Sequence, residues 1–526
     1  MKNHHLLFTM LFIGVLSVSA IKAQTFTPVS FSSDQKNSFA VAWRDYDNDG
    51  DPDVFISNHD ATNDLFRNDG NDTFTKITNT PLDDLARDTR GASWGDYDND
   101  GNLDLFVSSQ DGGNDNNFLY RNNGNGNFTE ITTGSIVTDG GTSKGCSWVD
   151  YDNDGDLDLF VANTGNEDNF LYRNDGPPGY NFTKITTGSV VTDGGNSVTG
   201  SWGDFDNDGD VDLVVTNESG QDNFLYRNDG NGIFVKLTNS NNYPMVADNG
   251  DSKSASWADY DNDEDLDLIV TNGSGEPTFV YRNDSGPGTN FTRVNMAPFT
   301  SDMNNSQGSS WGDFDNDGDV DLFVANTGGD DDYLYSNNGD GTFTNITTGP
   351  VVTDGASSRG GTWVDYNGDG YLDLFTATSG SSENLLYRND GTGNNWINIT
   401  AIGAGDGTSA TTNRSAIGAR ITVQANIGGS TVTQIQDIAG QTGLYGQNSL
   451  NAEFGLGNAA TIDLIKVRWT TGVEQNLTNQ GSNQFLTITE AGAPIGDPNI
   501  EVAPPSNNYG NVRVSESASQ TFIVSN

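Results

Sequence analysis

Seven stretches of nine residues carry an acidic side chain at nearly every second position, a spacing that could bind a metal ion. The first has the sequence DYDNDGDPD and spans residues 45–53. Carboxylates at positions 1, 3, 5 and 9, with a carbonyl at position 7, form an oxygen-only ligand set, which Ca²⁺ prefers over softer metals. Glycine at position 6 permits the positive-φ bend that folds such a loop around an ion. The pattern predicts up to seven Ca²⁺ sites, one in each stretch.

We call these stretches loops 1 to 7, and their predicted metal ligands stand at positions 1, 3, 5, 7 and 9. The residues are Asp45, Asp47, Asp49, Asp51 and Asp53; Asp96, Asp98, Asp100, Asn102 and Asp104; Asp150, Asp152, Asp154, Asp156 and Asp158; Asp204, Asp206, Asp208, Asp210 and Asp212; Asp259, Asp261, Asp263, Asp265 and Asp267; Asp313, Asp315, Asp317, Asp319 and Asp321; and Asp365, Asn367, Asp369, Tyr371 and Asp373. Asn102 is compatible with a site if position 7 offers only its backbone carbonyl. We expect loops 5 and 7 to bind the ion more weakly, because Glu264 replaces the glycine of loop 5 and Asn367 replaces a carboxylate of loop 7.

The residues that follow each loop predict a strand rather than a helix. An EF-hand would continue to a bidentate Glu at position 12, but Ile56 and Val107 stand there in the first two repeats. The short runs 54–56 and 103–107 are typical of buried β-strands. A tryptophan precedes each loop by two residues, and we expect it to pack between neighbouring units. These residues are Trp43, Trp94, Trp148, Trp202, Trp257, Trp311 and Trp363.

The loops recur at intervals of 51 to 55 residues, a period that indicates a repeat architecture. Each repeat reads as four short strands, the last two joined by Asn/Asp/Gly turns such as residues 68–70. Four-stranded units of this length are typical of propeller blades. The strand type that ends each repeat first occurs at residues 25–30, before loop 1, and none follows the seventh hairpin. We therefore expect an all-β, seven-bladed β-propeller over residues 24–394, closed by pairing of this N-terminal strand into the last blade.

The composition limits the partners of the chain. The formal net charge of −49 would repel nucleic acid and anionic membrane surfaces. The single cysteine, Cys146, cannot form an internal disulfide, and we expect it to be a small buried residue. Residues 1–23 resemble a secretory signal peptide, and no later stretch is apolar enough to cross a bilayer. We expect a secreted protein, extracellular or at the cell surface, with no integral membrane segment in the mature chain.

The recurring Asp spacing, the tryptophan and the Tyr-Arg-Asn-Asp-Gly hairpin together resemble the FG-GAP/VCBS repeat family, which is related to the integrin α-subunit propeller. The resemblance covers residues 25–391 and implies a Ca²⁺ loop between the first two strands of each blade. From residue 395 the period stops. The segments NRSAIGAR at 413–420, FGLG at 454–457 and VRW at 467–469 resemble the ASPIC/UnbV domain. This domain, assigned to residues 395–490, is paired with such a propeller in the cartilage acidic protein-like family.

Alternating runs such as residues 462–467 predict that the C-terminal domain is a small β domain. Its arginines Arg414, Arg420 and Arg468 could bind an anionic ligand, or pair with local acids or the propeller. Residues 491–498 read as a linker. Residues 499–526 resemble the first strands of an Ig-like domain, too few to bury its core, so we expect that domain to be truncated.

Three functions are compatible with the sequence. The first is a Ca²⁺-stabilised, monomeric binding or adhesion protein whose partner is an extracellular or cell-surface protein or glycan. The second is a polysaccharide lyase on a calcium-loaded propeller. Against an enzyme, His59 is the only histidine left after removal of residues 1–23, and no Ser/His/Asp or Cys/His set can be assembled. The third is a purely structural extracellular spacer. We expect no enzymatic activity.

Overall fold

The computed structural model describes residues 25–491, except residues 33, 84–87, 111–115, 125, 284–289, 381 and 406–410. The predicted signal peptide at 1–23 and Ig-like segment at 499–526 lie outside the described residues. The predicted linker does too, apart from residue 491.

The repeats fold into four-stranded antiparallel sheets. Six sheets take all four strands from one repeat. They are β3 (Ser38–Arg44), β4 (Asp53–Asn58), β5 (Asp64–Asn68) and β6 (Phe74–Ile77); β7 (Thr89–Gly95), β8 (Asp104–Ser109), β9 (Phe118–Asn122) and β10 (Phe128–Ile131); β11 (Ser143–Val149), β12 (Asp158–Asn163), β13 (Phe170–Asn174) and β14 (Phe182–Lys184); β15 (Ser197–Gly203), β16 (Asp212–Asn217), β17 (Phe224–Asn228) and β18 (Phe234–Leu237); β19 (Ser252–Ala258), β20 (Asp267–Asn272), β21 (Phe279–Asn283) and β22 (Phe291–Val294); and β23 (Asn305–Gly312), β24 (Asp321–Thr327), β25 (Tyr333–Asn337) and β26 (Phe343–Ile346).

One further four-stranded sheet closes the ring. It joins β27 (Ser358–Val364), β28 (Asp373–Thr378) and β30 (Leu385–Asn389) to β1 (Phe26–Val29), which pairs antiparallel with β30. The predicted closure by an N-terminal strand is therefore confirmed. The first strand of each sheet contacts the first strand of the next, and β27 contacts β3, so these innermost strands surround a common centre.

Short elements connect the blades. The two-residue strands β2 (Gln35–Lys36) and β29 (Ser382–Glu383) pair with each other beside the closure. Five 3₁₀ turns stand between successive sheets, namely η1 (Ser135–Val137), η2 (Ser189–Val191), η3 (Pro244–Val246), η4 (Phe299–Ser301) and η5 (Pro350–Val352). In the part of the chain that the structure describes, no helix has the length and apolar character needed to span a membrane.

The tryptophans occupy the place that their spacing predicts. Each lies near the end of an innermost strand, and its indole N–H donates a hydrogen bond to the preceding blade; Trp148 Nε1, for example, donates to the Ser93 carbonyl at 3.0 Å. The same bond recurs around the ring, at 2.9 to 3.4 Å. The rings also pack on aromatic side chains of the preceding blade, such as Phe106 against Trp148. Because one residue supplies both apolar area and a satisfied donor, it joins adjacent sheets without leaving a buried polar group.

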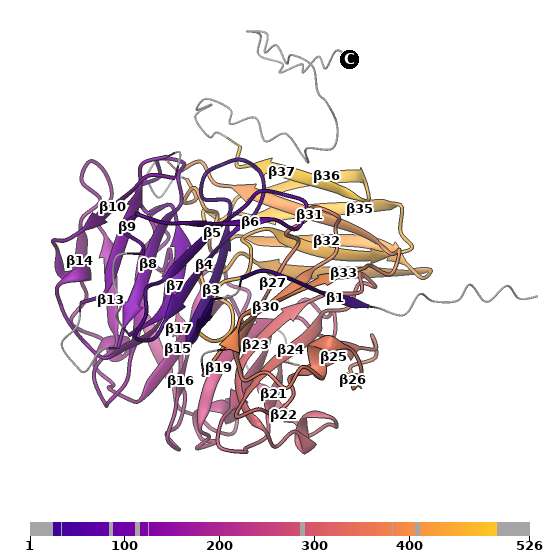
Figure 1. Ribbon diagram of the computed structural model, residues 1–526, viewed down its shortest axis with the longest axis horizontal. Coiled ribbons are helices and arrows are strands. Elements are labelled where there is room, and N and C mark those ends of the chain that lie inside the picture. Colours follow the sequence, from indigo (N-terminus) through magenta and orange to yellow (C-terminus); the bar gives the residue numbers. More distant parts are fainter. Residues whose placement is uncertain are drawn as a thin grey trace, which may run out of the picture.

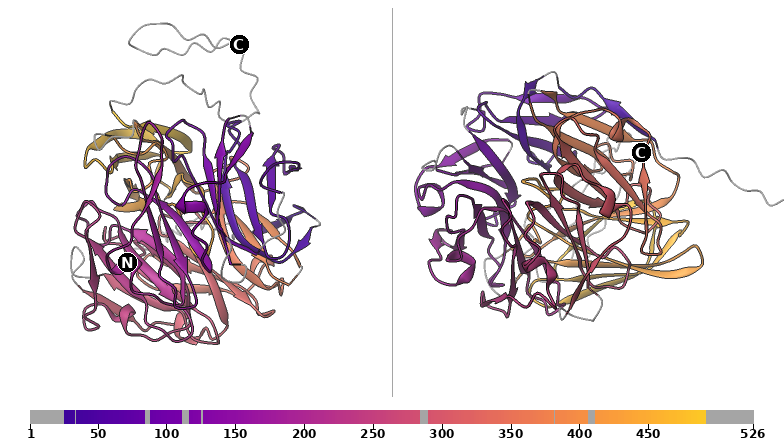
Figure 2. Two further views of the ribbon diagram at one scale, coloured as in Figure 1. Left: turned by 90° about the vertical axis from the view of Figure 1, so that its left-hand side faces the viewer. Right: turned by 90° about the horizontal axis from the view of Figure 1, so that it is seen from below.

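Seven further strands form the C-terminal domain. Strands β33 (Ser430–Asp437), β32 (Arg420–Ile427), β35 (Thr461–Arg468) and β36 (Glu474–Gly481) form one sheet, and β34 (Ala452–Gly457), β31 (Asn395–Ile402) and β37 (Gln484–Thr489) form another. Alternate side chains such as Ile421, Val423 and Ile465 fill the core between them. These strands, orange to yellow, gather on one side of the ring (Figure 1, and Figure 2, left).

Residues 438–449, which join β33 to β34 and which we call the insert, reach into the centre of the ring. Gln447 pairs with Ala42 of β3 in a parallel bridge, and its side-chain amide bonds the backbone of Trp94 on β7 at both ends, at 2.8 and 3.1 Å. Gly440 passes so close to β11 that an added Cβ would lie 2.1 Å from the Trp148 carbonyl oxygen. Further contacts reach Thr199 on β15, Ser310 on β23 and Trp363 on β27. The C-terminal domain is therefore anchored inside the propeller.

Candidate metal centres

Position 1 of each loop shapes the backbone around it. In loop 1, the two carboxylate oxygens of Asp45 accept the backbone N–H groups of Asp49 and Gly50, at 3.0 and 2.9 Å. The pair of bonds recurs in all seven loops at 2.8 to 3.2 Å. Position 6 has positive φ throughout, including Glu264 with φ of 71°. Loop 5 thus makes the expected bend with a residue for which this conformation is unfavourable.

Position 9 fixes each loop to its own blade. One oxygen of Asp53 accepts the N–H of Tyr46 at 3.1 Å, and the other accepts the N–H of Asn68 in the hairpin at 2.8 Å. Both bonds are present in every repeat. The Asn68 side chain in turn donates to the Tyr366 carbonyl of the preceding blade at 2.8 Å, a bond that also recurs around the ring.

The structure brings positions 1, 3 and 9 together in loops 1 to 4 and positions 1, 3 and 5 together in loop 5. Within each set, one carboxylate oxygen per residue lies within 4.8 Å of the others. Position 5 mainly organises the loop, because its side chain accepts the N–H of position 7, as Asp49 does from Asp51 at 3.1 Å. In loop 7 the amide oxygen of Asn367 accepts the N–H of Asp369 at 2.9 Å.

The carboxylate at position 3 indicates whether a cation fits these loops. One buried carboxylate oxygen has no hydrogen-bond partner among the described residues in each of Asp47, Asp98, Asp152 and Asp206. An unsatisfied buried carboxylate oxygen is costly, and a hard divalent cation would satisfy it. Since this atom is the same in four successive loops, the ligand set fits Ca²⁺. Asp45, Asp47 and Asp53 would hold such an ion in loop 1, and the same positions would hold it in loops 2 to 4.

The raised pKa values of the loop carboxyl groups also favour a bound cation. Burial, reinforced by repulsion from neighbouring carboxylates, raises the pKa of Asp45 to about 7 and that of Asp53 to about 9. The same causes raise the pKa of Asp96 to about 8, and those of Asp259 and Asp365 to about 7. Without a cation, these groups keep their protons to a higher pH than ordinary aspartates do. A bound divalent ion would reverse the preference, so metal binding and proton release are coupled.

Position 4 carries a contact that the sequence analysis missed. Asn153 donates from Nδ2 to Asp210, position 7 of the next loop, at 2.6 Å. Equivalent bonds run from loop 2 to 3, 4 to 5 and 5 to 6, and Asn316 donates to the Gly370 carbonyl of loop 7 at 2.8 Å. Gly368 stands at this position in loop 7 and has no amide to offer. The sequence signal for this contact is the asparagine that recurs at position 4 of loops 1 to 6, where its φ is positive.

The C-terminal domain lies over the face of the ring that carries the loops. Asp96 donates its N–H to Ser415 at 2.9 Å, and Arg420 donates to the Asp204 carbonyl at 2.8 Å and to Asp437 at 2.6 Å. Arg468 pairs with the Asp204 carboxylate at position 1 of loop 4. Two of the three unusual arginines thus pair with local acids and the propeller. The third, Arg414, donates its backbone N–H to Asn99 of loop 2.

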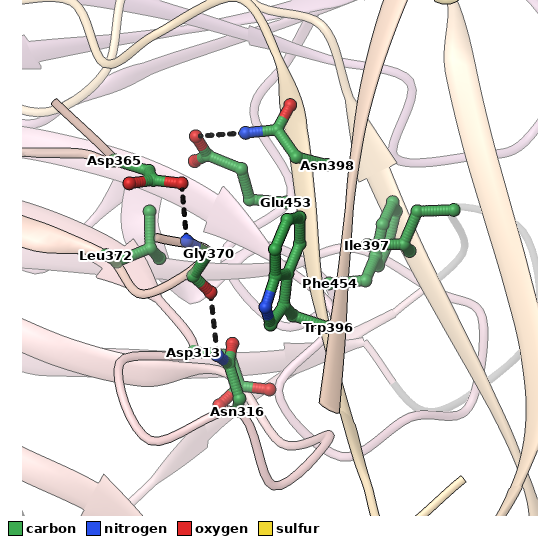
Figure 3. Close-up of a pocket in the computed structure, with 10 residues that line it drawn as sticks. All are labelled: Asp313, Asn316, Asp365, Gly370, Leu372, Trp396, Ile397, Asn398, Glu453 and Phe454. Carbon is green, nitrogen blue, oxygen red and sulfur yellow. Dashed lines mark hydrogen bonds between the residues drawn. The ribbon is translucent and has the colours of Figure 1, made fainter. Parts of the chain in front are cut away.

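Loops 6 and 7 face the same domain across a small pocket. Figure 3 shows Asp313 and Asp365, position 1 of these loops, opposite Trp396 and Glu453 of the C-terminal domain. Asn398 donates to the Glu453 carboxylate at 3.2 Å. Burial, followed by the nearby Asp365 charge, raises the pKa of Glu453 to about 8. The domain therefore adds a carboxyl group beside the loops.

Comparison with known proteins accounts for both parts of the chain. The FG-GAP-like repeat family matches residues 45–107, 100–161, 150–215, 204–270, 259–324 and 313–376, and the ASPIC and UnbV family matches residues 407–495. Cartilage acidic protein 1 of Homo sapiens is 24% identical over 522 residues, covering 89% of this chain and 75% of that protein. The Xenopus tropicalis protein of the same name is 22% identical, covering 83% and 70%.

Solved structures are similar at a lower level. A lectin from Agrocybe aegerita, described as recognising non-reducing terminal N-acetylglucosamine, has a TM-score of 0.46 and 21% identity, covering 67% of this chain and 91% of that one. Virginiamycin B lyase from Staphylococcus aureus has a TM-score of 0.44 and 12% identity, covering 69% and 99%. The repeat match extends over more than half of the chain, and the second match follows it. The chain therefore belongs to the FG-GAP-like repeat family and carries an ASPIC and UnbV domain after its repeats.

Proposed function

We propose that this chain is a secreted, monomeric, calcium-binding propeller without enzymatic activity, which binds a protein or glycan outside the cell or at its surface. The observation that supports calcium is the buried, unpartnered carboxylate oxygen at position 3 of successive loops. The ions would stabilise the scaffold, because a ligand that binds only the folded state adds to its stability.

The surface partner is expected on the face opposite the loops. Each loop joins the first strand of a blade to the second, so the second-to-third connections and the links between blades lie at the other end of the sheets. We call this end the free face, since the C-terminal domain covers the loop face. Connections there differ between repeats, and varied loops on a rigid scaffold are where specificity is commonly located.

Side chains at the centre of the free face suit recognition. Arg90 and Arg359 stack on Phe39, with guanidinium carbons 3.7 and 3.8 Å from the ring centroid. Burial, together with the neighbouring Arg90 charge, lowers the pKa of Arg359 to about 10. His59 is held close by, with Nδ1 2.7 Å from Asp88 and Nε2 3.3 Å from Asp60. The centre of the free face therefore offers cationic and aromatic groups for binding.

Two measurements test the proposal. The full chain is first unfolded thermally with excess Ca²⁺ and with a chelator, and bound ions are counted by elemental analysis. We expect a large loss of stability in chelator and about five to seven ions, consistent with an oxygen-only site in each loop. Unchanged melting with no bound ion would remove the basis for calcium.

The second measurement is capture of the chain by cell-surface preparations, with and without enzymatic removal of glycans. The Arg359→Ala variant should lose capture, whereas Thr431→Ala, an exposed position in the C-terminal domain, should keep it. Capture unaffected by Arg359→Ala would place the partner elsewhere.

Turnover of an acidic polysaccharide would contradict the absence of enzymatic activity.

A further inference from the structure

The insert fills the centre of the ring unevenly. The tryptophans Trp43, Trp94, Trp148 and Trp363 are at most 1% exposed. In contrast, Trp257 and Trp311 of the fifth and sixth repeats are partly exposed, although they occupy the same position in their blades. The insert also reaches β23, where Asn448 contacts Ser310, but it leaves part of the Trp257 and Trp311 side chains uncovered.

The uncovered side is a cavity of about 100 Å³ between the propeller and the C-terminal domain, which we call the chamber. By the usual space of about 10–15 Å³ per water, it would hold roughly seven to ten waters, or a molecule with a similar number of heavy atoms. The propeller contributes Trp202, Trp257 and Trp311, and the C-terminal domain contributes glutamine and asparagine side chains. The chamber is adjacent to the pocket of Figure 3, with which it shares Asp313 and Glu453.

Three amide side chains keep a polar atom available in the chamber. Gln434 donates from Nε2 to the Gly455 carbonyl at 2.8 Å, and Gln436 accepts the Glu453 N–H at 3.1 Å. Asn448 accepts from Ser310 and from the Trp363 N–H. The other polar atom of each amide has no hydrogen bond within the described part of the chain. Gln434 as a whole is only 4% exposed, so its polar atoms lie inside the chamber rather than on the outer surface.

The chemistry of the lining selects a class of ligand. Acidic groups, Asp259, Asp313 and Glu453, can accept hydrogen bonds from hydroxyls, and the tryptophan edges offer apolar contact to C–H groups. The lining contains no lysine or arginine, so an anion would enter unpaired beside carboxylates. Free amide donors, a free amide acceptor and aromatic edges together suit a small molecule with many hydroxyl groups.

We propose that the chamber is a binding site for a neutral, hydroxyl-rich small molecule of about seven to ten heavy atoms, the size of a four-carbon polyol. The ligand would lie between the tryptophans of β15, β19 and β23 and the amides of the C-terminal domain, and would bridge the two domains. This site is separate from the free face, and it exists whether or not a surface partner binds there.

The test uses the full chain saturated with Ca²⁺ and follows tryptophan fluorescence. The probes are erythritol, threitol and, as a charged counterpart of similar size, erythronate. We expect a saturable change with a neutral polyol at millimolar concentration and binding of erythronate about a hundredfold weaker, because burying its unpaired charge is costly. No saturable change with any probe, or equal binding of erythronate, would overturn the proposal.

Substitutions inside and outside the chamber show whether the fluorescence change comes from binding there. Ala439→Phe places a ring in the chamber and should abolish the change, whereas Thr431→Phe, exposed on the same domain, should not. Gln436→Leu conserves the volume and removes the free donor, so binding should weaken about three- to tenfold. Melting curves check that each variant is folded. A response that persists in folded Ala439→Phe would place binding outside the chamber, and none of these outcomes depends on capture by cell surfaces.

Discussion

At the scale of the residue, the oxygen at position 3 is the atom through which the proposed calcium ion would act in loops 1 to 4. Asp152 has one carboxylate oxygen buried without a hydrogen bond among the described residues. Its replacement, Asp152→Asn, should remove one bound ion and lower stability at saturating Ca²⁺. The loss should be about 2–3 kcal/mol, the linkage energy of a site near one hundredfold saturation. Ion counting and thermal unfolding measure both effects.

The control is Asp168→Asn, which removes the same charge at an exposed site between β12 and β13. Its ion count and melting temperature should match those of the parent chain. If Asp152→Asn kept the full number of ions, Asp152 would not be a ligand.

Protonation of the loops gives the metal-free chain an unusual pH dependence. The pKa values of Asp45 and Asp53 are raised to about 7 and about 9 by burial, above the value of about 4 in the unfolded chain. A raised folded-state pKa means that the folded chain holds more protons, so its stability falls as pH rises through the folded pKa values. In chelator, melting temperature should decrease from pH 5 to pH 9. A rise over this range would contradict the assignment.

The affinity for Ca²⁺ should show the opposite dependence on pH from the stability of the metal-free chain. The ion requires deprotonated carboxylates, so its affinity should increase as pH rises toward 9, with proton release on binding. Calorimetry in two buffers of different ionisation enthalpy measures the protons released. No proton release at pH 6 would mean that the loops are already ionised there.

At the scale of the element, the loops act as a connected series rather than as independent sites. Asn153 joins loop 3 to loop 4, while its own φ of 55° is the left-handed conformation that asparagine tolerates better than alanine. Asn153→Gly keeps the conformation and removes the bond, as Gly368 does naturally in loop 7. It should destabilise the chain by about 1 kcal/mol, the usual net worth of one hydrogen bond.

Asn153→Ala should cost more than the glycine variant, by about 1 kcal/mol for the strained φ. Chemical unfolding of the two variants separates the hydrogen bond from the conformation. Equal stability of Asn153→Gly and the parent chain would show that the link between loops contributes nothing.

Much of each blade could be predicted from the sequence because its determinants are local and repeated. The Asp loop, the tryptophan and the N-terminal strand each specify their place through spacing alone. Asn153 was not predicted as a link, because its partner Asp210 is in the next repeat, 57 residues later. The position-9 carboxylates were predicted as ligands, and the structure shows that they also accept two backbone N–H groups, which a residue list does not reveal.

At the scale of the whole molecule, the insert connects the C-terminal domain to the inner strands of the propeller. No repeat or period marks residues 438–449, so nothing in the sequence indicated that they would enter the ring. Gly440 lies against β11, where an added Cβ would be 2.1 Å from a carbonyl oxygen, and Gly443 approaches Ser309 almost as closely. Such contacts leave no room for a side chain without displacement of the backbone.

Gly440→Ala should therefore weaken the seating of the insert by about 1–3 kcal/mol, the usual range for overpacking. We expect one unfolding transition for the parent chain, and a broader or divided transition for this variant. Gly481→Ala is the matched control, because the nearest atom to its added Cβ is 3.9 Å away. A sharp, unshifted unfolding transition in Gly440→Ala would show that the insert accommodates the added methyl group without loss of stability.

The pairing of β1 with β30 also sets an order of events during synthesis. Residues 26–29 leave the ribosome long before their partner strand, which ends at Asn389, so the nascent chain carries an unpaired strand until nearly the whole propeller has been made. Contacts this distant in sequence form slowly, and an open sheet edge invites pairing with other chains. The insert is synthesised later still, so we expect the ring to close before its centre is filled.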